Sequence, residues 1–285
     1  MNVTPLNPPP GSPIRRLRGR LRPRTRPRFR GLSFNRMLPN ILTMLGLCAG
    51  LTSMRLALEG RFGMAAAAIV LAGAIDGLDG RLARLLKATS RFGAEFDSLS
   101  DFLCFGVAPA FVMYLWSLDR AGAYGFVPCL IFAVCMALRL ARFNAALDTE
   151  PDELHAYVYN FFTGVPAPAG AGVVLFPLFL GLEAKSLGWT QLLAITQFPL
   201  FPALFLTGTA LLLVSTLPVW SFKNFKIPAE YVLPTLLGVG LYAALLVADP
   251  WAALAAGGLI YLVMLPFSRR SFHRLRREAE EPEAS

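Results

Sequence analysis

The chain has 285 residues, of which 55% are hydrophobic and only 16% are charged, and its mean hydropathy is +0.53. Soluble globular domains carry about a quarter of charged residues, so this composition excludes a single water-soluble domain. The formal net charge is +9, because 27 Lys and Arg outnumber 18 Asp and Glu. A charge of this sign favours an anionic partner, either nucleic acid or the surface of a membrane.

Residues 1–36 are rich in arginine and contain no apolar run of the kind that a secretory signal peptide requires. Prolines interrupt residues 13–30 and prevent a long amphipathic helix. We therefore expect a basic arm, disordered or interfacial, that is attracted to anionic membrane lipids. No recognisable nucleic-acid-binding fold accompanies the arginines, so we predict no nucleic-acid partner.

Long apolar runs separated by short polar breaks follow the basic arm. A helix that crosses a membrane needs about 20 mainly apolar residues. The sequence predicts an all-α integral membrane protein, a polytopic helical bundle of about eight transmembrane helices. Six or seven remain possible, because Pro199 and Pro202 could break one of them. The predicted spans are 38–57, 64–87, 94–117, 122–142, 164–182, 195–218, 230–248 and 250–267.

The positions of the basic residues predict the orientation of these spans, because cytoplasmic loops of membrane proteins are enriched in Lys and Arg. With eight spans, all the Lys and Arg fall on one side except Arg55, Arg61, Arg120 and Lys185. We therefore expect both termini in the cytoplasm. The predicted division is a basic arm (1–36), a membrane core (37–226), additional transmembrane helices (227–268) and a cytoplasmic tail (269–285).

Four acidic residues lie inside apolar runs, where charges are costly and usually functional. Asp76 and Asp79 are three apart, and Asp97 and Asp101 are four apart, so each pair shares a helix face. A helical hairpin with its turn at 87–90 brings the two pairs to one depth. Carboxylates that converge at low dielectric hold either protons or cations, which leaves two interpretations. One is an ion or proton pathway, and the other is a site for divalent cations such as Mg²⁺ or Mn²⁺.

The residues next to the aspartates favour the cation site. Gly80 and Gly93 leave room for a ligand or for another backbone. Arg84 lies one turn beyond Gly80, and Ser90 lies at the turn. Arginine is well suited to bind phosphate oxygens, so we interpret the cluster as a site where metals and a guanidinium bind a diphosphate.

Residues 76–101, DGLDGRLARLLKATSRFGAEFDSLSD, resemble the CDP-alcohol phosphotransferase signature D-x2-D-G-x2-A-R-x8-G-x3-D-x3-D at every fixed position. The resemblance implies an integral-membrane enzyme that moves a phosphatidyl-type group from a CDP-linked donor to an alcohol and releases CMP. It also implies two divalent ions, Mg²⁺ or Mn²⁺, held by Asp76, Asp79, Asp97 and Asp101, with Asp101 also acting as the general base. PNILT at 39–43 is similar to a further element of the family. The implied CDP-lipid-binding residues are Asn40, Thr43, Gly80, Arg84 and Ser90.

Three stretches outside the signature bear on the acceptor alcohol: DFLCFGVAPA (101–110), LRLARFN (138–144) and FFTGVPAPAG (161–170). They are similar to bacterial membrane-spanning CDP-diacylglycerol-serine O-phosphatidyltransferases, with Cys104 where serine is usual. This resemblance implies CDP-diacylglycerol and L-serine as substrates, a homodimer, and the bacterial inner membrane as the location. A serine carboxylate needs a fixed cation, so the candidate acceptor-binding residues are Arg139, Arg142 and Asn144.

Other functions share these features. A sister transferase that uses choline, glycerol 3-phosphate or inositol phosphate would carry the same main signature. A phosphorylated acceptor would need more cations than the two arginines found in 127–170. A choline acceptor would favour an aromatic box. An ion or proton transporter is the alternative from another class, although no second copy of the 76–101 pattern is present. The aromatic candidates for the box are Tyr157, Tyr159, Phe161 and Phe162.

Overall fold

The structure is a computed structural model that describes residues 34–147, 161–216, 218–220 and 229–280. Nearly all of the basic arm predicted for residues 1–36 therefore lies outside the described residues. Tyr157 and Tyr159 lie outside them as well, and the side chains of Phe161 and Phe162 are not described.

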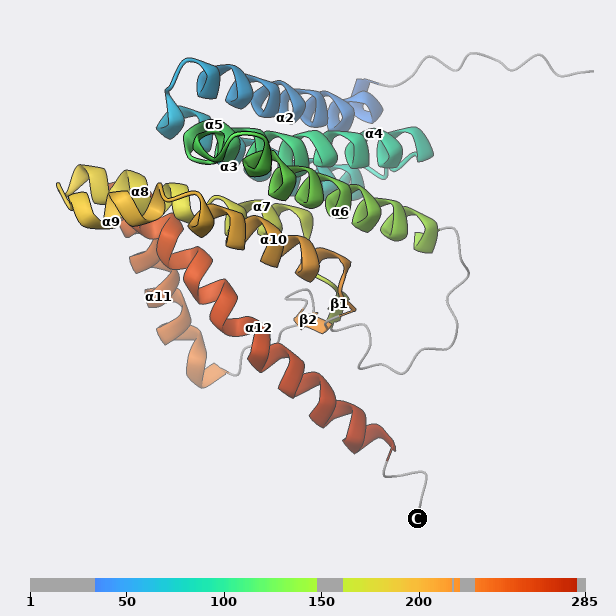
Figure 1. The fold of residues 1–285 in the computed structure, drawn as a ribbon. Helices are drawn as coiled ribbons and strands as arrows, with labels where there is room; N and C mark the ends of the chain where they lie inside the picture. Colours follow the sequence, from blue (N-terminus) through green and yellow to red (C-terminus); the bar gives the residue numbers. More distant parts are fainter. Residues whose placement is uncertain (1–33, 148–160, 217, 221–228, 281–285) are drawn as a thin grey trace, which may run out of the picture. The chain divides into compact units, whose positions relative to one another are not determined.

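The described residues are almost wholly helical, which confirms the prediction of an all-α membrane protein (Figure 1). The exception is a short ribbon, in which β1 (Phe161–Thr163) pairs antiparallel with β2 (Pro218–Trp220). The helices of the first half are α2 (Phe34–Leu58), α3 (Phe62–Leu85), α4 (Arg91–Asp101), the π-helix η1 (Phe102–Val107), α5 (Ala108–Trp116), the 3₁₀-helix η2 (Leu118–Ala121) and α6 (Ala123–Leu147). Those of the second half are α7 (Ala167–Val174), α8 (Phe176–Ser186), α9 (Thr190–Thr196), α10 (Leu200–Val214), α11 (Ala229–Ala248) and α12 (Pro250–Glu280).

Within the described residues, six helices are long and apolar enough to cross a membrane, and one of them is the continuous run of α4, η1 and α5. Two further candidates are bent pairs, α7 with α8 at 42° and α9 with α10 at 48°. If each pair is one span, the total is eight, so the predicted range of six to eight is confirmed and the chain is an integral membrane protein.

Prolines explain both bends. Pro199 stands at the N-cap of α10, just after α9 has ended, so the break considered at Pro199 and Pro202 is present. The run 164–182 contains a break that the hydropathy pattern did not predict, because α8 begins just before Pro177. A proline cannot donate its backbone nitrogen to the preceding turn, so it starts a helix more readily than it continues one.

Helix α12 is longer than the span predicted for it. The apolar run ends near residue 267, whereas the helix continues to Glu280 through a stretch rich in arginine. Arginine and glutamate are good helix formers, so the helix continues beyond the end of the apolar run. Helix α11 packs against α12. It has exposed leucines and valines along its length, as a helix in contact with lipid does.

Small residues let α2 pack closely against η1. A Cβ added at Gly50 would lie 2.5 Å from the sulfur of Cys104, so only glycine fits without a shift of the neighbouring helix. The Cys104 thiol donates to the carbonyl of Gly46 at 3.4 Å. Cys104 therefore makes a hydrogen bond to α2.

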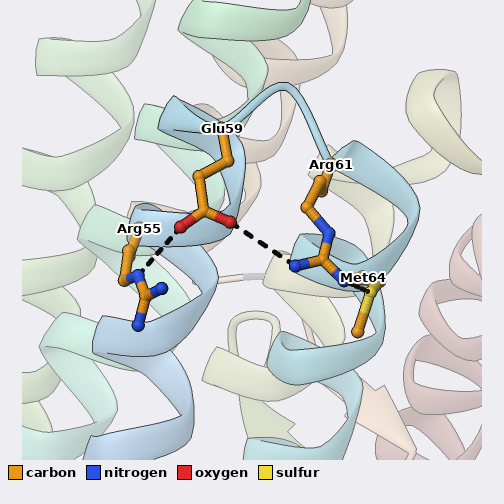
Figure 2. A network of polar contacts seen from close by, with 4 residues as sticks. All are labelled: Arg55, Glu59, Arg61 and Met64. Atoms are coloured by element: carbon orange, nitrogen blue, oxygen red, sulfur yellow. Dashed lines mark hydrogen bonds and ion pairs between the residues drawn. The ribbon is translucent and has the colours of Figure 1, made fainter.

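The turn between α2 and α3 carries a small polar network (Figure 2). Glu59 accepts hydrogen bonds from Arg55 at 2.9 Å and from Arg61 at 3.5 Å, and Arg61 also contacts the sulfur of Met64 at 2.7 Å. Arg55 and Arg61 are two of the four basic residues that the predicted topology places outside the cytoplasm. Because Glu59 offsets one of these two charges, the net charge of this turn is smaller than its arginines alone suggest.

Candidate active site

The aspartate pairs lie on a helical hairpin formed by α3 and α4, as the sequence predicts. Helix α3 ends at Leu85 and α4 begins at Arg91, so the turn lies at the predicted position. Lys87 adopts a left-handed backbone conformation there, with φ of 49°. Ser90 then caps α4, because its Oγ accepts a hydrogen bond from the backbone nitrogen of Gly93 at 3.0 Å.

Three of the four aspartates form one close group. Asp76, Asp97 and Asp101 each offer a carboxylate oxygen, and these oxygens lie within 4.8 Å of one another. Asp79 lies beside this group, only 4% exposed, and accepts a hydrogen bond from Thr43 Oγ1 at 2.6 Å. All four side chains line one small cavity between α2, α3, α4 and the start of η1.

The chemistry of this donor set fits divalent cations. Three half-buried carboxylates at such short range repel one another when they are ionised, and a bound cation removes that repulsion. All of the donors are oxygens, which Mg²⁺ and Mn²⁺ prefer. The group therefore provides the ligands that a divalent metal site requires.

A second cavity, of about 190 Å³, adjoins the aspartates on the side of the hairpin turn. Asp79 and Asp97 line both cavities. A Cβ at Gly93 would approach Asn40 Oδ1 and Ser90 Oγ to 3.1 Å, whereas nothing lies within 4 Å of the corresponding point at Gly80. Gly80 thus leaves its part of the cavity open for a ligand. The predicted CDP-lipid residues that line this cavity are Asn40, Thr43, Gly80 and Ser90.

Arg84, the fifth predicted CDP-lipid residue, does not line that cavity. It is exposed on α3, and its Nε donates to the carbonyl of Gly80 at 3.0 Å. Its long side chain starts one turn from the cavity, so contact with a bound ligand requires a different rotamer.

The π-helix η1 begins directly after Asp101 and was not predicted from the sequence. Such single-turn insertions are rare and occur frequently at functional sites. The sequence does contain a feature that could have indicated this irregular turn. Pro109 at the start of α5 has no N–H, so it cannot donate a helical hydrogen bond to the carbonyl of Phe105. On the N-terminal side of Asp101, the Ser100 hydroxyl donates a hydrogen bond to the backbone carbonyl of Thr43 at 3.4 Å, which connects α4 to α2.

The three predicted acceptor residues lie near the end of α6, and each has a different neighbour. Arg139 is half-buried and interacts electrostatically with Asp101. Arg142 is exposed, and its Nη1 donates to the carbonyl of Val214 on α10 at 3.1 Å. Asn144 accepts from Ser98 Oγ at 3.0 Å, which connects α6 to α4. Arg139 is therefore the member of this set that faces the carboxylates.

Comparison with known proteins identifies the family of the chain. The sequence model described as CDP-alcohol phosphatidyltransferase matches residues 36–200, and a second one, described as CDP-alcohol phosphatidyltransferase 2, matches residues 230–266. A protein of Mycobacterium leprae is 42% identical over 87% of this chain and 78% of its own length. One from Mycobacterium tuberculosis strain H37Rv is 40% identical over 87% and 82%, and one from Helicobacter pylori strain 26695 is 32% identical over 80% and 88%. All three relatives are named CDP-diacylglycerol–serine O-phosphatidyltransferase.

Proposed function

The chain belongs to the CDP-alcohol phosphatidyltransferase family, and from this premise we propose that it transfers the phosphatidyl group of CDP-diacylglycerol to the hydroxyl of L-serine. The products are phosphatidylserine and CMP. The observation that carries the proposal is the close group of Asp76, Asp97 and Asp101, which has a cavity beside it and Arg139 near Asp101. The names of the relatives support both substrates.

In this proposal the 190 Å³ cavity receives the CDP part of the donor. Asn40 supplies an amide, Thr43 a hydroxyl, and Gly80 the space for a close approach. Ser90 lines the same cavity and caps α4, so it holds the turn in place as well as contacting the donor. Arg84 reaches the diphosphate after a change of rotamer, which breaks the hydrogen bond from its Nε to the Gly80 carbonyl.

Asp76, Asp97 and Asp101 would hold two divalent ions, Mg²⁺ or Mn²⁺, with Asp79 as a further ligand. Such ions would supply positive charge that neutralises the diphosphate and stabilises the attacking and leaving oxygens. Thr43 orients the Asp79 carboxylate through its 2.6 Å hydrogen bond. Supporting hydrogen bonds of this kind commonly set the position of a metal ligand.

Asp101 also acts as the general base. A serine hydroxyl is a weak nucleophile at neutral pH, so a carboxylate within hydrogen-bonding reach must accept its proton as it attacks. The serine oxygen forms a bond to the phosphorus that carries diacylglycerol, and the bond from that phosphorus to the CMP oxygen breaks. The proton passes to Asp101, and CMP leaves with the bonding electrons.

Serine is favoured over choline by the charge next to Asp101. Arg139 is a fixed cation, half-buried in α6, and it suits the carboxylate of serine. The same cation repels the ammonium of choline, which has no carboxylate to compensate. Sister transferases with phosphorylated acceptors remain the nearest alternative, because a phosphate is also an anion.

The acceptor is tested with the purified full-length protein in micelles that contain CDP-diacylglycerol and Mn²⁺ or Mg²⁺. We expect CMP release and lipid labelling with radiolabelled serine, and none above background with choline, glycerol 3-phosphate or inositol phosphate. Labelling with one of these compounds in place of serine would assign the chain to a sister activity. Protein from which the metal has been removed by a chelator should be inactive until Mn²⁺ or Mg²⁺ is restored.

The two arginines of α6 should differ in their effect on serine. Arg139→Ala removes the cation that faces Asp101 and should raise the serine KM by about ten- to hundredfold, as loss of a charged hydrogen bond does. Arg142→Ala should change the serine KM by less than about threefold, since Arg142 already donates to the carbonyl of Val214. Steady-state rates at saturating CDP-diacylglycerol measure both values. A larger effect at Arg142 would place the serine carboxylate elsewhere.

The orientation and assembly of the protein belong to the same proposal. Both termini lie in the cytoplasm of a bacterium, and the chain forms a homodimer in the inner membrane. Residues 37–226 are the catalytic membrane core, preceded by the basic arm 1–36, which contacts anionic lipids. Residues 227–268 add two helices, and residues 269–285 form the cytoplasmic tail. Protease protection of each terminus in inverted vesicles tests the orientation.

A further inference from the structure

Two buried polar groups near the aspartates lack hydrogen-bond partners among the described residues. One is Nε of Arg139 on α6, and the other is the hydroxyl of Tyr261 on α12. A buried donor without a partner is costly, so such groups are rare unless a ligand or water supplies the missing hydrogen bond. The two groups interact electrostatically with each other, and Arg139 also interacts with Asp101.

Tyr261 reaches this region from the C-terminal helices. It lines an apolar cavity of about 310 Å³, whose walls come from α3, η1, α7, α8, α11 and α12. Phe105 of η1 lines this cavity and also the cavity of the four aspartates, so the two are neighbours. Gly73, one turn before Asp76 on α3, lines the apolar cavity as well. Helix α12 therefore lines a cavity next to the one that contains the four aspartates.

We propose that the Tyr261 hydroxyl and the Arg139 guanidinium together bind the carboxylate of the amino-acid acceptor, so that α12 completes the acceptor site. Both groups are donors, and a carboxylate supplies two acceptor oxygens for them. Arg139 interacts with Asp101, so a serine whose carboxylate binds Arg139 has its hydroxyl, two bonds from its α-carbon, near the base. The inference rests on the proposed function, and it assigns the C-terminal helices a part in substrate binding.

The variant Tyr261→Phe tests this inference because it removes one oxygen and keeps the ring that lines the apolar cavity. Serine KM should rise by about ten- to hundredfold, the range expected for a hydrogen bond to a charged group. The KM for CDP-diacylglycerol and the rate at saturating serine should stay within about twofold of the unmodified protein. Serine methyl ester, which lacks the carboxylate charge, should show the same KM with both proteins.

Tyr242→Phe is the matched control. Tyr242 lies on α11, lines the same apolar cavity, and donates to the carbonyl of Ala253 at 3.1 Å. Its hydroxyl thus has a partner within the C-terminal helices, and its loss should leave the serine KM unchanged. An equal rise in both variants would show a general effect on packing and overturn the inference.

The remaining outcomes separate the inference from the proposed function. If the unmodified protein releases CMP with serine but Tyr261→Phe leaves the serine KM unchanged, the inference is wrong and the function stands. A fall in the saturated rate without a change in KM would also overturn it, because the hydroxyl would then act on the reaction and not on acceptor binding. If the unmodified protein shows no serine-dependent CMP release, the proposed function itself fails.

Discussion

Replacing Asp101 with Asn should lower kcat by about 10²- to 10⁴-fold, the contribution that a positioned general base makes. The amide keeps the size of the side chain and one oxygen, but it cannot accept the proton of the serine hydroxyl. Binding of CDP-diacylglycerol should persist, because the cavity assigned to its CDP part is lined by Asn40, Thr43 and Gly80 and not by Asp101. Rates of CMP release, together with direct binding of the CDP-lipid, measure the two effects separately.

Asp119→Asn is the control for this experiment. Asp119 is an exposed carboxylate in η2, outside both cavities lined by aspartates, and its replacement should leave kcat within about twofold. Substantial turnover by Asp101→Asn would reject Asp101 as the base. Loss of CDP-lipid binding in the same variant would instead show that Asp101 acts chiefly in assembling the site.

Replacing Asp97 with Asn should weaken Mn²⁺ binding and abolish measurable turnover. Asp97 belongs to the close carboxylate group and also lines the cavity assigned to the donor, so it stands between the metals and the diphosphate. Loss of a residue that only supports a ligand typically costs 10- to 100-fold in metal affinity, so loss of the ligand itself should cost at least as much. Titration with Mn²⁺, followed by its electron paramagnetic resonance signal, measures affinity without reference to activity.

Glu59→Gln is the corresponding control for metal binding. Glu59 is a carboxylate of the α2–α3 turn, where it pairs with Arg55 and Arg61 (Figure 2). Its removal should not change Mn²⁺ affinity. If Asp97→Asn binds Mn²⁺ as tightly as the unmodified protein, the carboxylate group does not hold the metal in the way proposed here.

Much of the site follows from local spacing and could be predicted from the sequence. The intervals between Asp76 and Asp79 and between Asp97 and Asp101 place each pair on one helix face, whatever surrounds the helices. The turn at 87–90 follows from the symmetry of the two pairs, and the hairpin has it at that position. The apolar runs predicted membrane helices because unpaired backbone groups are too costly in lipid.

Hydropathy did not reveal two features of the helices. The bend between α7 and α8 and the π-helix after Asp101 lie within long, mainly apolar runs, and each has a proline close by, Pro177 or Pro109. A third feature depended on contacts between distant residues. Among the three predicted acceptor residues, the sequence could not distinguish Arg139 from Arg142, since both lie on one face of α6. The distinction comes from neighbours on other helices: Asp101 for Arg139 and Val214 for Arg142.

The amino-acid sequence alone was sufficient to predict a helical membrane protein and to identify its four aspartates as a candidate site. Composition indicates the class of the protein, and helical periodicity relates residues that are only a few turns apart. Only the tertiary structure decided which carboxylates form the close group, and that Asp79 pairs with Thr43 beside it. It also brought Tyr261 to the same region, 160 positions after Asp101 in the chain. The physical reason is that helix packing in a membrane depends on close fit between small and large side chains, which no single helix encodes.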